Sequence, residues 1–220
     1  MTTIRVTSIL LAAIGSWYDW RVGVAAMLLL AAACEWLLRR VSELESLVKH
    51  SEMRAIRDPL TCLFNRRWFE ETSFEIKPGT GVIVADVDHF KSYNDRWGHA
   101  GGDAVLQELA RLLRRIFGTG ELVCRLGGEE FLIILPHVSF DQLRGCAELL
   151  VEESRLLNVH LDGELLGAIT VSAGIAQAPH HATTIEGLIS AADRALYAAK
   201  SAGRDCVATP PHQVVERDAA

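Results

Sequence analysis

The stretch Gly81-Val-Ile-Val-Ala-Asp-Val-Asp88 decides the fold of this chain, because it is almost entirely apolar up to its acidic end. A short apolar run of this kind, opened by a glycine, is typical of a strand buried inside a sheet. A helical pattern begins with the following residues, His89-Phe90-Lys91. The sequence therefore predicts a buried strand that presents the carboxylate of Asp86 at the edge of a sheet, where a helix follows.

Helical and strand patterns alternate along the rest of the chain. The predicted helices are 67–75, 103–117, 141–157 and 185–202, and the predicted strands are 81–87, 121–126, 129–135 and 168–176. The glycines at positions 127 and 128 indicate a hairpin between two of these strands. The pattern predicts an α/β or α+β domain over residues 58–208, followed by a flexible tail, 209–220.

Composition excludes several classes of protein. The chain has 220 residues, of which 50% are hydrophobic and 23% charged, so one domain with an appendage is expected and a disordered chain is not. A net charge of −6 argues against a broad basic surface, so no nucleic-acid partner is expected. The five cysteines include no Cys-x-x-Cys pair, which argues against a disulfide framework or a zinc site and favours a reducing compartment.

The first 38 residues contain two apolar runs, 4–18 and 22–38, separated by Asp19-Trp20-Arg21. Because a membrane-spanning helix needs about 20 residues, the runs predict a transmembrane helical hairpin, although whether one or two helices span stays open. Arginines at positions 5, 39 and 40 flank the hairpin, which places both of its ends in the cytoplasm. Two alternatives stay open: a secretory signal with a cleavage box at 30–34, and a helical pair buried in a soluble protein.

Residues 39–57 predict a charged helical connector. Leu37, Val41, Leu44 and Val48 follow the spacing of a coiled-coil interface, although the pattern covers barely two heptads and a solvated connector stays the alternative. Proline at position 59 discourages a continuing helix and marks the boundary of the next domain.

Residues that could bind a metal or take part in catalysis lie at two places in the sequence. Asp86 ends its strand, and Gly127-Gly-Glu-Glu-Phe131 puts Glu129 on a tight turn between two strands. If these strands are neighbours, Asp86 and Glu129 can bind a hard divalent cation such as Mg²⁺. The helix opened by Phe90 and Lys91 offers free N–H groups and a positive charge to phosphates. Each motif alone is commonly structural, but together they favour a magnesium-nucleotide site.

Several blocks of sequence, in this order, resemble the GGDEF family of diguanylate cyclases. They are Asp58-Pro-Leu-Thr-Cys-Leu-Phe-Asn-Arg-Arg67, Asp86–Lys91, Asn94-Asp95, Gly98-His99, Gly102-Asp103, Gly127–Phe131 and Ala195-Leu-Tyr-Ala-Ala-Lys200. The resemblance covers residues 58 to about 207. It implies an α+β fold similar to the palm of nucleotidyl cyclases and polymerases, with a central, mainly antiparallel five-stranded sheet wrapped by helices. It also implies condensation of two GTP into cyclic di-GMP with release of two pyrophosphates.

The resemblance further implies a role for each matched residue. Asp86, Glu129 and the carbonyl of Val87 resemble the ligands of Mg²⁺, with Mn²⁺ as an alternative. Glu129 resembles the group that assists deprotonation of the ribose 3′-hydroxyl, with Glu130 as a second candidate, and Lys91 resembles the charge that stabilises the transferring phosphoryl group. The substrate-binding residues would be Phe90, Asn94, His99, Asp103, Lys200 and Arg204. Of these, Asn94 and Asp103 match the guanine readers, and a carboxylate suits that role because it accepts from both N1–H and N2–H₂ of guanine.

Since one domain of this family holds one GTP, the resemblance implies a homodimer. With the predicted hairpin it implies a protein of the bacterial inner membrane, with the catalytic domain in the cytoplasm. The alternative function is a catalytically silent GGDEF module that acts as a nucleotide receptor or membrane scaffold. The match at Asp86, Lys91, Asn94, Asp103 and Glu129 argues against it, since silent members typically lose such residues.

Three positions depart from the family pattern, and one pair of histidines matches no motif. Cys62 stands where the family usually has glycine, so strain is expected if this position needs a positive φ. The Arg-x-x-Asp motif for product inhibition is absent, because Gly118 and Glu121 take the places of its arginine and aspartate. We expect His180 and His181 to lie in an exposed loop.

Overall fold

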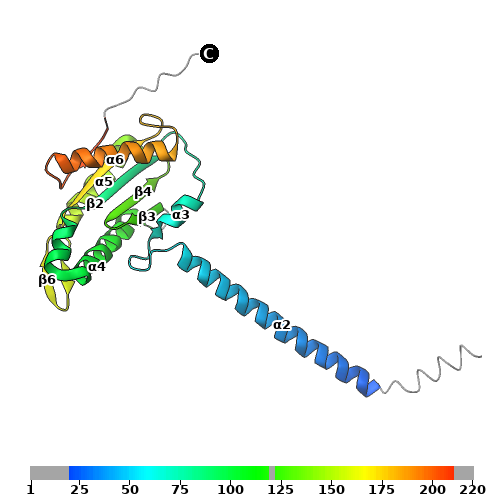
Figure 1. Ribbon diagram of the computed structural model, residues 1–220. Helices are drawn as coiled ribbons and strands as arrows, with labels where there is room; N and C mark the ends of the chain where they lie inside the picture. Colours follow the sequence, from blue (N-terminus) through cyan, green and yellow to red (C-terminus); the bar gives the residue numbers. More distant parts are fainter. Residues whose placement is uncertain (1–19, 119–121, 211–220) are drawn as a thin grey trace, which may run out of the picture. The chain divides into compact units, whose positions relative to one another are not determined.

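The computed structural model describes residues 20–118 and 122–210, and the chain divides into two compact units, Met1–Met53 and Arg54–Ala220. The helix α2 (Trp20–Ala55) forms the described part of the first unit, and an α+β domain forms the second (Figure 1). The predicted apolar run 4–18 and residues 211–220 of the predicted tail lie outside the described residues.

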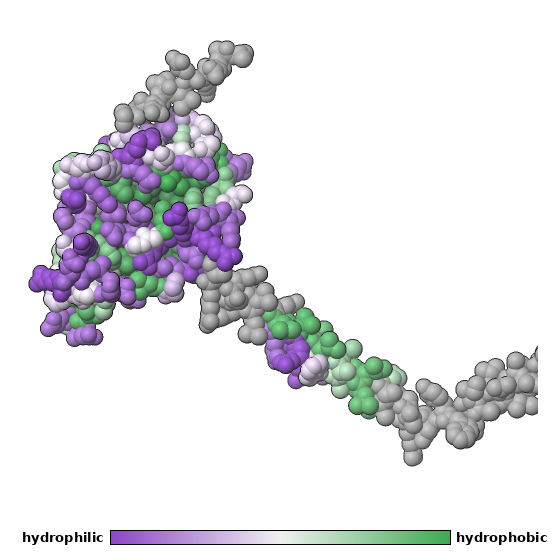
Figure 2. Space-filling model, viewed as in Figure 1, coloured by the Kyte–Doolittle hydropathy of each residue, from purple (hydrophilic) through white to green (hydrophobic). Residues whose placement is uncertain are grey.

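Helix α2 joins the predicted segments 22–38 and 39–57 into one helix. No glycine or proline occurs between residues 24 and 55, so nothing in the sequence interrupts the helix before Asp58-Pro59. Between residues 27 and 44, where the side chains are described, its large apolar side chains are exposed (Figure 2). They are Met27, Leu28, Leu29, Leu30, Trp36, Leu37, Leu38, Val41 and Leu44. Within the described part of the chain, no helix has the length and apolarity needed to cross a membrane.

The domain is built on a six-stranded sheet with the order β1-β3-β4-β2-β7-β8. The strands are β1 (Phe64–Asn65), β2 (Gly81–Val87), β3 (Leu122–Gly127), β4 (Glu130–Leu135), β7 (Val171–Gln177) and β8 (Val207–Ala208). The four central strands pair antiparallel, and each two-residue edge strand pairs parallel. The five strands that the resemblance implied were wrong, since the sheet has six. The sequence pattern predicted the four central strands, and edge strands of two residues are too short to show an alternating pattern. A separate hairpin consists of β5 (Val159–Leu161) and β6 (Glu164–Gly167).

Four helices accompany the sheet, and their ends differ from prediction where the local signal is weak. They are α3 (Arg66–Glu71), α4 (Phe90–Phe117), α5 (Phe140–Arg155) and α6 (Ile185–Ser201). Helix α5 begins at a capping box between Ser139 and Gln142, and α6 begins at Thr184, whose side chain accepts from the N–H of Gly187. The predicted helix 103–117 is only the second part of α4, which starts at Phe90 and bends at Gly98 (φ 70°).

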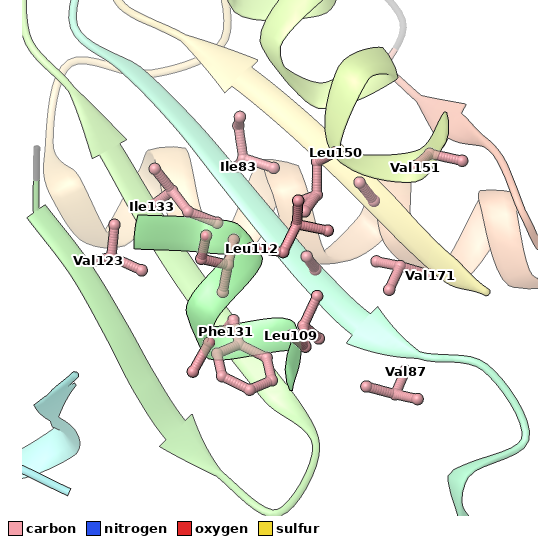
Figure 3. Close-up of a cluster of buried hydrophobic side chains, with 14 of the residues drawn as sticks. Ile83, Val87, Leu109, Leu112, Val123, Phe131, Ile133, Leu150, Val151 and Val171 are labelled. Carbon is pink, nitrogen blue, oxygen red and sulfur yellow. The ribbon is translucent and has the colours of Figure 1, made fainter. Parts of the chain in front are cut away.

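Alternate residues of β2 point to opposite faces of the sheet. Both faces are covered by helices, so these residues belong to two separate clusters of buried side chains. Ile83 and Val87 face a core completed by Leu109 and Leu112 of α4 and Leu150 of α5 (Figure 3). The other face packs against α6, and it includes Val82, Val84, Leu188 and Ala192. A Cβ at Gly174 of β7 would lie 2.0 Å from the carbonyl oxygen of Ala192, so only glycine lets α6 lie this close to the sheet.

One histidine differs from expectation. His180 is exposed as predicted, but His181 is buried, with 6% of its surface accessible. The backbone N–H of Gln177 donates to its Nδ1 at 3.0 Å, and Phe140 packs nearby with the ring centroids 5.8 Å apart. Helix α5 therefore covers a side chain that the sequence, with no motif around it, did not assign to the core.

Candidate active site

The end of β2 and the β3–β4 turn lie side by side at one edge of the sheet. In the β2–β4 register Asp86 is opposite Glu130, and the backbone N–H of Val87 donates to the carbonyl of Glu129 at 3.4 Å. The expectation that Asp86 and Glu129 come from neighbouring strands is confirmed. The structure thus brings together Asp86, Val87, Glu129 and Glu130.

Glycines and one arginine shape the turn that carries Glu129. Gly128 has φ 53°, in the left-handed region that favours glycine, and the β3–β4 register shifts between Arg125 and Gly127. The guanidinium of Arg125 donates to the carbonyl of Gly128 from Nε at 3.1 Å and from Nη2 at 2.7 Å. The residue immediately before Glu129 is therefore held by a two-point hydrogen bond, which the sequence motif did not reveal.

The carboxylates at this edge disfavour one another's negative charge. Burial raises the pKa of Asp86, and the charges of Glu130 and Asp88 raise it further, whereas the Lys200 ammonium opposes the rise. The Nζ of Lys200 lies 2.7 Å from Oδ1 of Asp86, whose side chain is only 5% exposed. The pKa of Glu129 is also raised, first by burial and then by the charges of Asp86 and Glu130. The edge is a place where additional positive charge is stabilising.

The donor set fits a hard divalent cation. Carboxylate and carbonyl oxygens are the ligands that Mg²⁺ prefers, and Mg²⁺ usually keeps several waters or phosphate oxygens in its shell. Within residues 20–118 and 122–210, no group of three or more His, Cys, Asp or Glu side chains is arranged to hold a metal. The predicted set needs only two side chains, Asp86 and Glu129, together with the carbonyl of Val87. Their raised pKa values supply the electrostatic reason for a cation there.

The start of α4 follows directly on this edge. His89, in the left-handed region with φ 54°, precedes the helix without a side-chain hydrogen bond that caps it. Phe90 is buried against the core, and Lys91 is exposed on the first turn. A helix N-terminus without a side-chain cap has N–H groups that can bind an anion. Two of the predicted phosphate-binding residues, Phe90 and Lys91, therefore lie on the helix that follows Asp86.

The bend in α4 brings the two predicted guanine readers together. A Cβ at Gly102 would lie 2.1 Å from Oδ1 of Asn94, so the Asn94 side chain rests directly against the backbone at residue 102. Asp103 is the next residue and is exposed. His99 is exposed just after the bend at Gly98. Asn94, on the first part of α4, thus lies beside Asp103 on the second part, as a site for one planar base requires.

A pocket of about 430 Å³ lies between α3 and α6 and adjoins the carboxylate edge. Its polar lining includes Arg66, Glu130, Tyr197 and Lys200, and its apolar lining includes Phe69 and Leu126. In Figure 2 the apolar surface between these helices is bordered by hydrophilic residues. The sequence did not predict this pocket, because its walls come from segments that are far apart in the chain, and no single motif contains them all.

Asp88 has a different role from its neighbour Asp86. Its side chain is buried and accepts hydrogen bonds from Oγ1 of Thr170 at 2.9 Å, from Oγ of Ser172 at 2.7 Å and from the backbone N–H of Asp205 at 3.0 Å. Its acceptor oxygens are thus occupied by protein donors. Arg204, the predicted phosphate contact, is exposed in the turn that Asp88 holds.

Comparison with known proteins agrees with this arrangement. Residues 55–206 match the family described as "Diguanylate cyclase, GGDEF domain". The chain is 38% identical over 183 residues to the diguanylate cyclase DgcP of Pseudomonas aeruginosa, covering 77% of this chain and 27% of that protein. It is 36% identical over 172 residues to the diguanylate cyclase VdcA of Vibrio cholerae, covering 76% of this chain and 50% of that protein. The chain thus spans at most half the length of these two relatives.

Solved structures show the same fold. The coiled coil and GGDEF domain of DgcB from Caulobacter crescentus, in complex with c-di-GMP, superimposes with a TM-score of 0.72 at 31% identity, covering 81% of this chain and 98% of that chain. The GGDEF domain of PA1120 from Pseudomonas aeruginosa superimposes with a TM-score of 0.65 at 34% identity, covering 69% of this chain and 92% of that chain. On these grounds the chain belongs to the GGDEF family of diguanylate cyclase domains.

Proposed function

We propose that this chain is a magnesium-dependent diguanylate cyclase that condenses two GTP into cyclic di-GMP and releases two pyrophosphates. One observation carries the proposal: Asp86 and Glu129 from neighbouring strands meet beside Lys200, on the edge where α4 and its Asn94–Asp103 pair begin. This arrangement supports a site in which Asp86 and Glu129 hold the metal, Lys200 contacts phosphate, and Asn94 and Asp103 bind the base.

The substrate is held by groups of opposite character at its two ends. The carboxylate of Asp103 accepts from N1–H and N2–H₂ of guanine, and the amide of Asn94 completes the recognition of the base. At the other end, Lys91, Lys200 and Arg204 supply positive charge, and the first N–H groups of α4, at Phe90, donate to the phosphates. His99 lies directly after the bend between the two parts of α4.

The reaction transfers a nucleotidyl group to a ribose hydroxyl. Glu129 takes the proton of a 3′-hydroxyl as the general base. The 3′-oxygen forms a bond to the α-phosphorus of the other GTP, and the bond from that phosphorus to pyrophosphate breaks. Lys91 stabilises the negative charge that develops on the phosphoryl oxygens. Mg²⁺ bound by Asp86, Glu129 and the Val87 carbonyl would act as a Lewis acid toward the phosphate.

The reaction needs two copies of the domain, because each copy holds one GTP and each 3′-hydroxyl attacks the other copy's substrate. We therefore propose a homodimer. Leu37, Val41 and Leu44, which follow coiled-coil spacing, are exposed on α2 in the single chain and support pairing of this helix. Pairing raises the effective concentration of one catalytic domain toward the other.

We further propose that the N-terminal segment anchors the chain in the inner membrane of a bacterium, with the catalytic domain in the cytoplasm. Support comes from the apolar runs 4–18 and 22–38 and from the arginines at 5, 39 and 40. Compartment reporters fused after residue 20 and after residue 57 would test it. Opposite compartments are expected, and a cytoplasmic signal from both fusions would overturn the membrane hairpin.

The enzyme assay is incubation of the full chain with GTP and Mg²⁺, followed by chromatography of the products. The proposal expects cyclic di-GMP and pyrophosphate from the parent chain, and almost none from Glu129→Gln. A matched control is Glu148→Gln, which changes an exposed carboxylate on α5 and is expected to leave the rate unchanged. Binding of GTP without any product would instead favour the silent receptor.

A further inference from the structure

The turn after α6 is attached to both carboxylates of Asp86-Val-Asp88. At the end of α6, Nζ of Lys200 lies 2.7 Å from Asp86. Beyond the helix, the N–H of Asp205 donates to Oδ2 of Asp88 at 3.0 Å. Arg204 lies between these two attachments and its side chain is exposed. The end of β2 therefore contacts a side chain before Arg204 and holds the backbone directly after it.

The backbone of this turn is in a conformation that few side chains adopt. Gly203, Arg204 and Asp205 have φ values of 122°, 68° and 52°. Two successive residues with a Cβ in the left-handed region are strained, and they persist only where surrounding contacts hold them. The contacts around Asp205 hold this conformation together with a hydrogen bond from the N–H of Arg204 to the carbonyl of Ala199 at 3.0 Å.

Arg155, the last residue of α5, supplies most of these contacts. Its Nε lies 2.9 Å from each carboxylate oxygen of Asp205, and its Nη2 donates to the backbone carbonyl of Asp205 at 3.1 Å. Asp88 holds the N–H of the same residue, and Asp88 is in turn held by Thr170 and Ser172. Side chain, carbonyl and amide of Asp205 are thus all fixed.

We propose that Arg155 and Asp88 are positioning residues for GTP, acting through Arg204. The proposal rests on the proposed function, in which Arg204 binds the phosphates. With Asp205 immobilised, the Arg204 side chain leaves the backbone at a fixed point, four residues after Lys200. Without Arg155 the turn relaxes from its left-handed conformation, and Arg204 binds the phosphates less often. Arg155 itself needs no contact with substrate.

The test is a double-mutant cycle in the full chain with Arg155→Ala, Arg204→Ala and both together, measuring KM for GTP and kcat with Mg²⁺. Arg155→Ala is expected to raise KM about fivefold, in keeping with a partly exposed ion pair, and to leave kcat nearly unchanged. In the Arg204→Ala background the same change should raise KM no further, because the residue through which it acts is gone. Arg155→Lys, which keeps the charge but loses the forked donors, is expected to lie between the parent and Arg155→Ala.

The control is Arg115→Ala, which removes a comparable ion pair between α4 and Glu153 of α5, with 3.2 Å between the charged atoms. It should leave KM unchanged. Equal KM increases from Arg155→Ala with and without Arg204 would overturn the proposal, as would an unchanged KM in both Arg155 variants. An inactive parent chain would refute the proposed function instead, so the two failures are distinguishable.

Discussion

The guanidinium of Arg125 joins Asp58, near the start of the domain, to the turn that carries Glu129. Its Nη1 lies 3.0 Å and 3.1 Å from the two carboxylate oxygens of Asp58, while Nε and Nη2 donate to the carbonyl of Gly128. The two charged side chains are only 14% and 17% exposed. Asp58 also accepts from the N–H and the hydroxyl of Thr61 at 2.8 Å and 2.6 Å. We call Asp58, Arg125 and Gly128 the Arg125 bridge.

The first prediction concerns the Arg125 bridge. Arg125→Lys keeps the charge but loses the planar fork, whose separate nitrogens reach the Asp58 carboxylate and the Gly128 carbonyl at the same time. We expect the free energy of unfolding to fall by about 1–3 kcal/mol, the cost of an incompletely paired buried group. We also expect kcat to fall about tenfold, because Glu129 is less firmly placed. Urea unfolding and initial rates measure the two effects, with the exposed Arg111→Lys as control. A parental kcat in a destabilised variant would contradict the link to catalysis.

The same bridge predicts a dependence of stability on pH. Burial alone would raise the pKa of Asp58, but hydrogen bonds from Thr61 and the Arg125 guanidinium outweigh it and hold the pKa below its usual range. A lowered pKa contributes stability above the unfolded value and loses it as the pH falls through the folded value. Asp58→Asn should therefore destabilise the domain at pH 7, and its difference from the parent should shrink below about pH 4. A constant difference between pH 7 and pH 3 would count against this assignment.

The third prediction separates activity from stability at Glu129. Glu129→Gln removes a charge from the metal site, so turnover should fall at least about 10²-fold. Because burial and the neighbouring Asp86 raise the pKa of Glu129, the ionised carboxylate is a cost in the metal-free fold. The variant should thus unfold at the same or a slightly higher temperature at pH 7, and this gain should vanish below about pH 4, where the parent is protonated. A parental rate of cyclic di-GMP synthesis would show that the assignment is wrong.

The fourth prediction concerns the choice of base. Asp103→Ser removes the carboxylate that accepts two hydrogen bonds from guanine, while Asn94 keeps its place against Gly102. Discrimination between GTP and ATP should fall by about 1–3 kcal/mol, the scale of one unpaired polar group. Competition between the two nucleotides for one enzyme preparation measures it. Unchanged selectivity would refute Asp103 as the reader.

The fifth prediction concerns feedback by the product. Gly118 takes the place of the arginine of the inhibitory motif, and its φ of 70° is a conformation that arginine rarely adopts. Glu121, in place of the aspartate, lies outside the described residues. We expect initial rates to be insensitive to added cyclic di-GMP up to tens of micromolar, a range chosen around moderate affinity. A steep loss at low micromolar product would contradict this, and Glu121→Ala would show whether this motif or another surface is responsible.

Some structural details were foreseeable from single positions. Cys62 has φ 58°, so the strain expected from a residue other than glycine is present. Its N–H donates to the backbone carbonyl of Asp58 at 2.8 Å, and this hydrogen bond closes the turn. The bend of α4 was not foreseen, although Gly98 and the close approach at Gly102 require it. Gly98 alone predicts no bend, because an isolated glycine within a helix is often tolerated.

The sequence by itself determined the central strands, the turn at Gly127-Gly128 and the family. These features are local: an apolar run with an acidic end, or two glycines between strands, specifies its conformation through nearest neighbours. It also placed Asp86 and Glu129 in one site, because a buried strand beside a hairpin brings their ends to the same edge of the sheet.

Only the tertiary structure decided which side chains hold that site in place. Arg125 meets Asp58 across 67 residues, Arg155 meets Asp205 across 50, and Asp88 meets the amide of Asp205 across 117. No local pattern encodes these pairs, since they form only when the helices have packed on the sheet and set the direction of each side chain. The same packing brings Lys200 to Asp86, so charged residues from separate motifs lie together at one edge of the sheet.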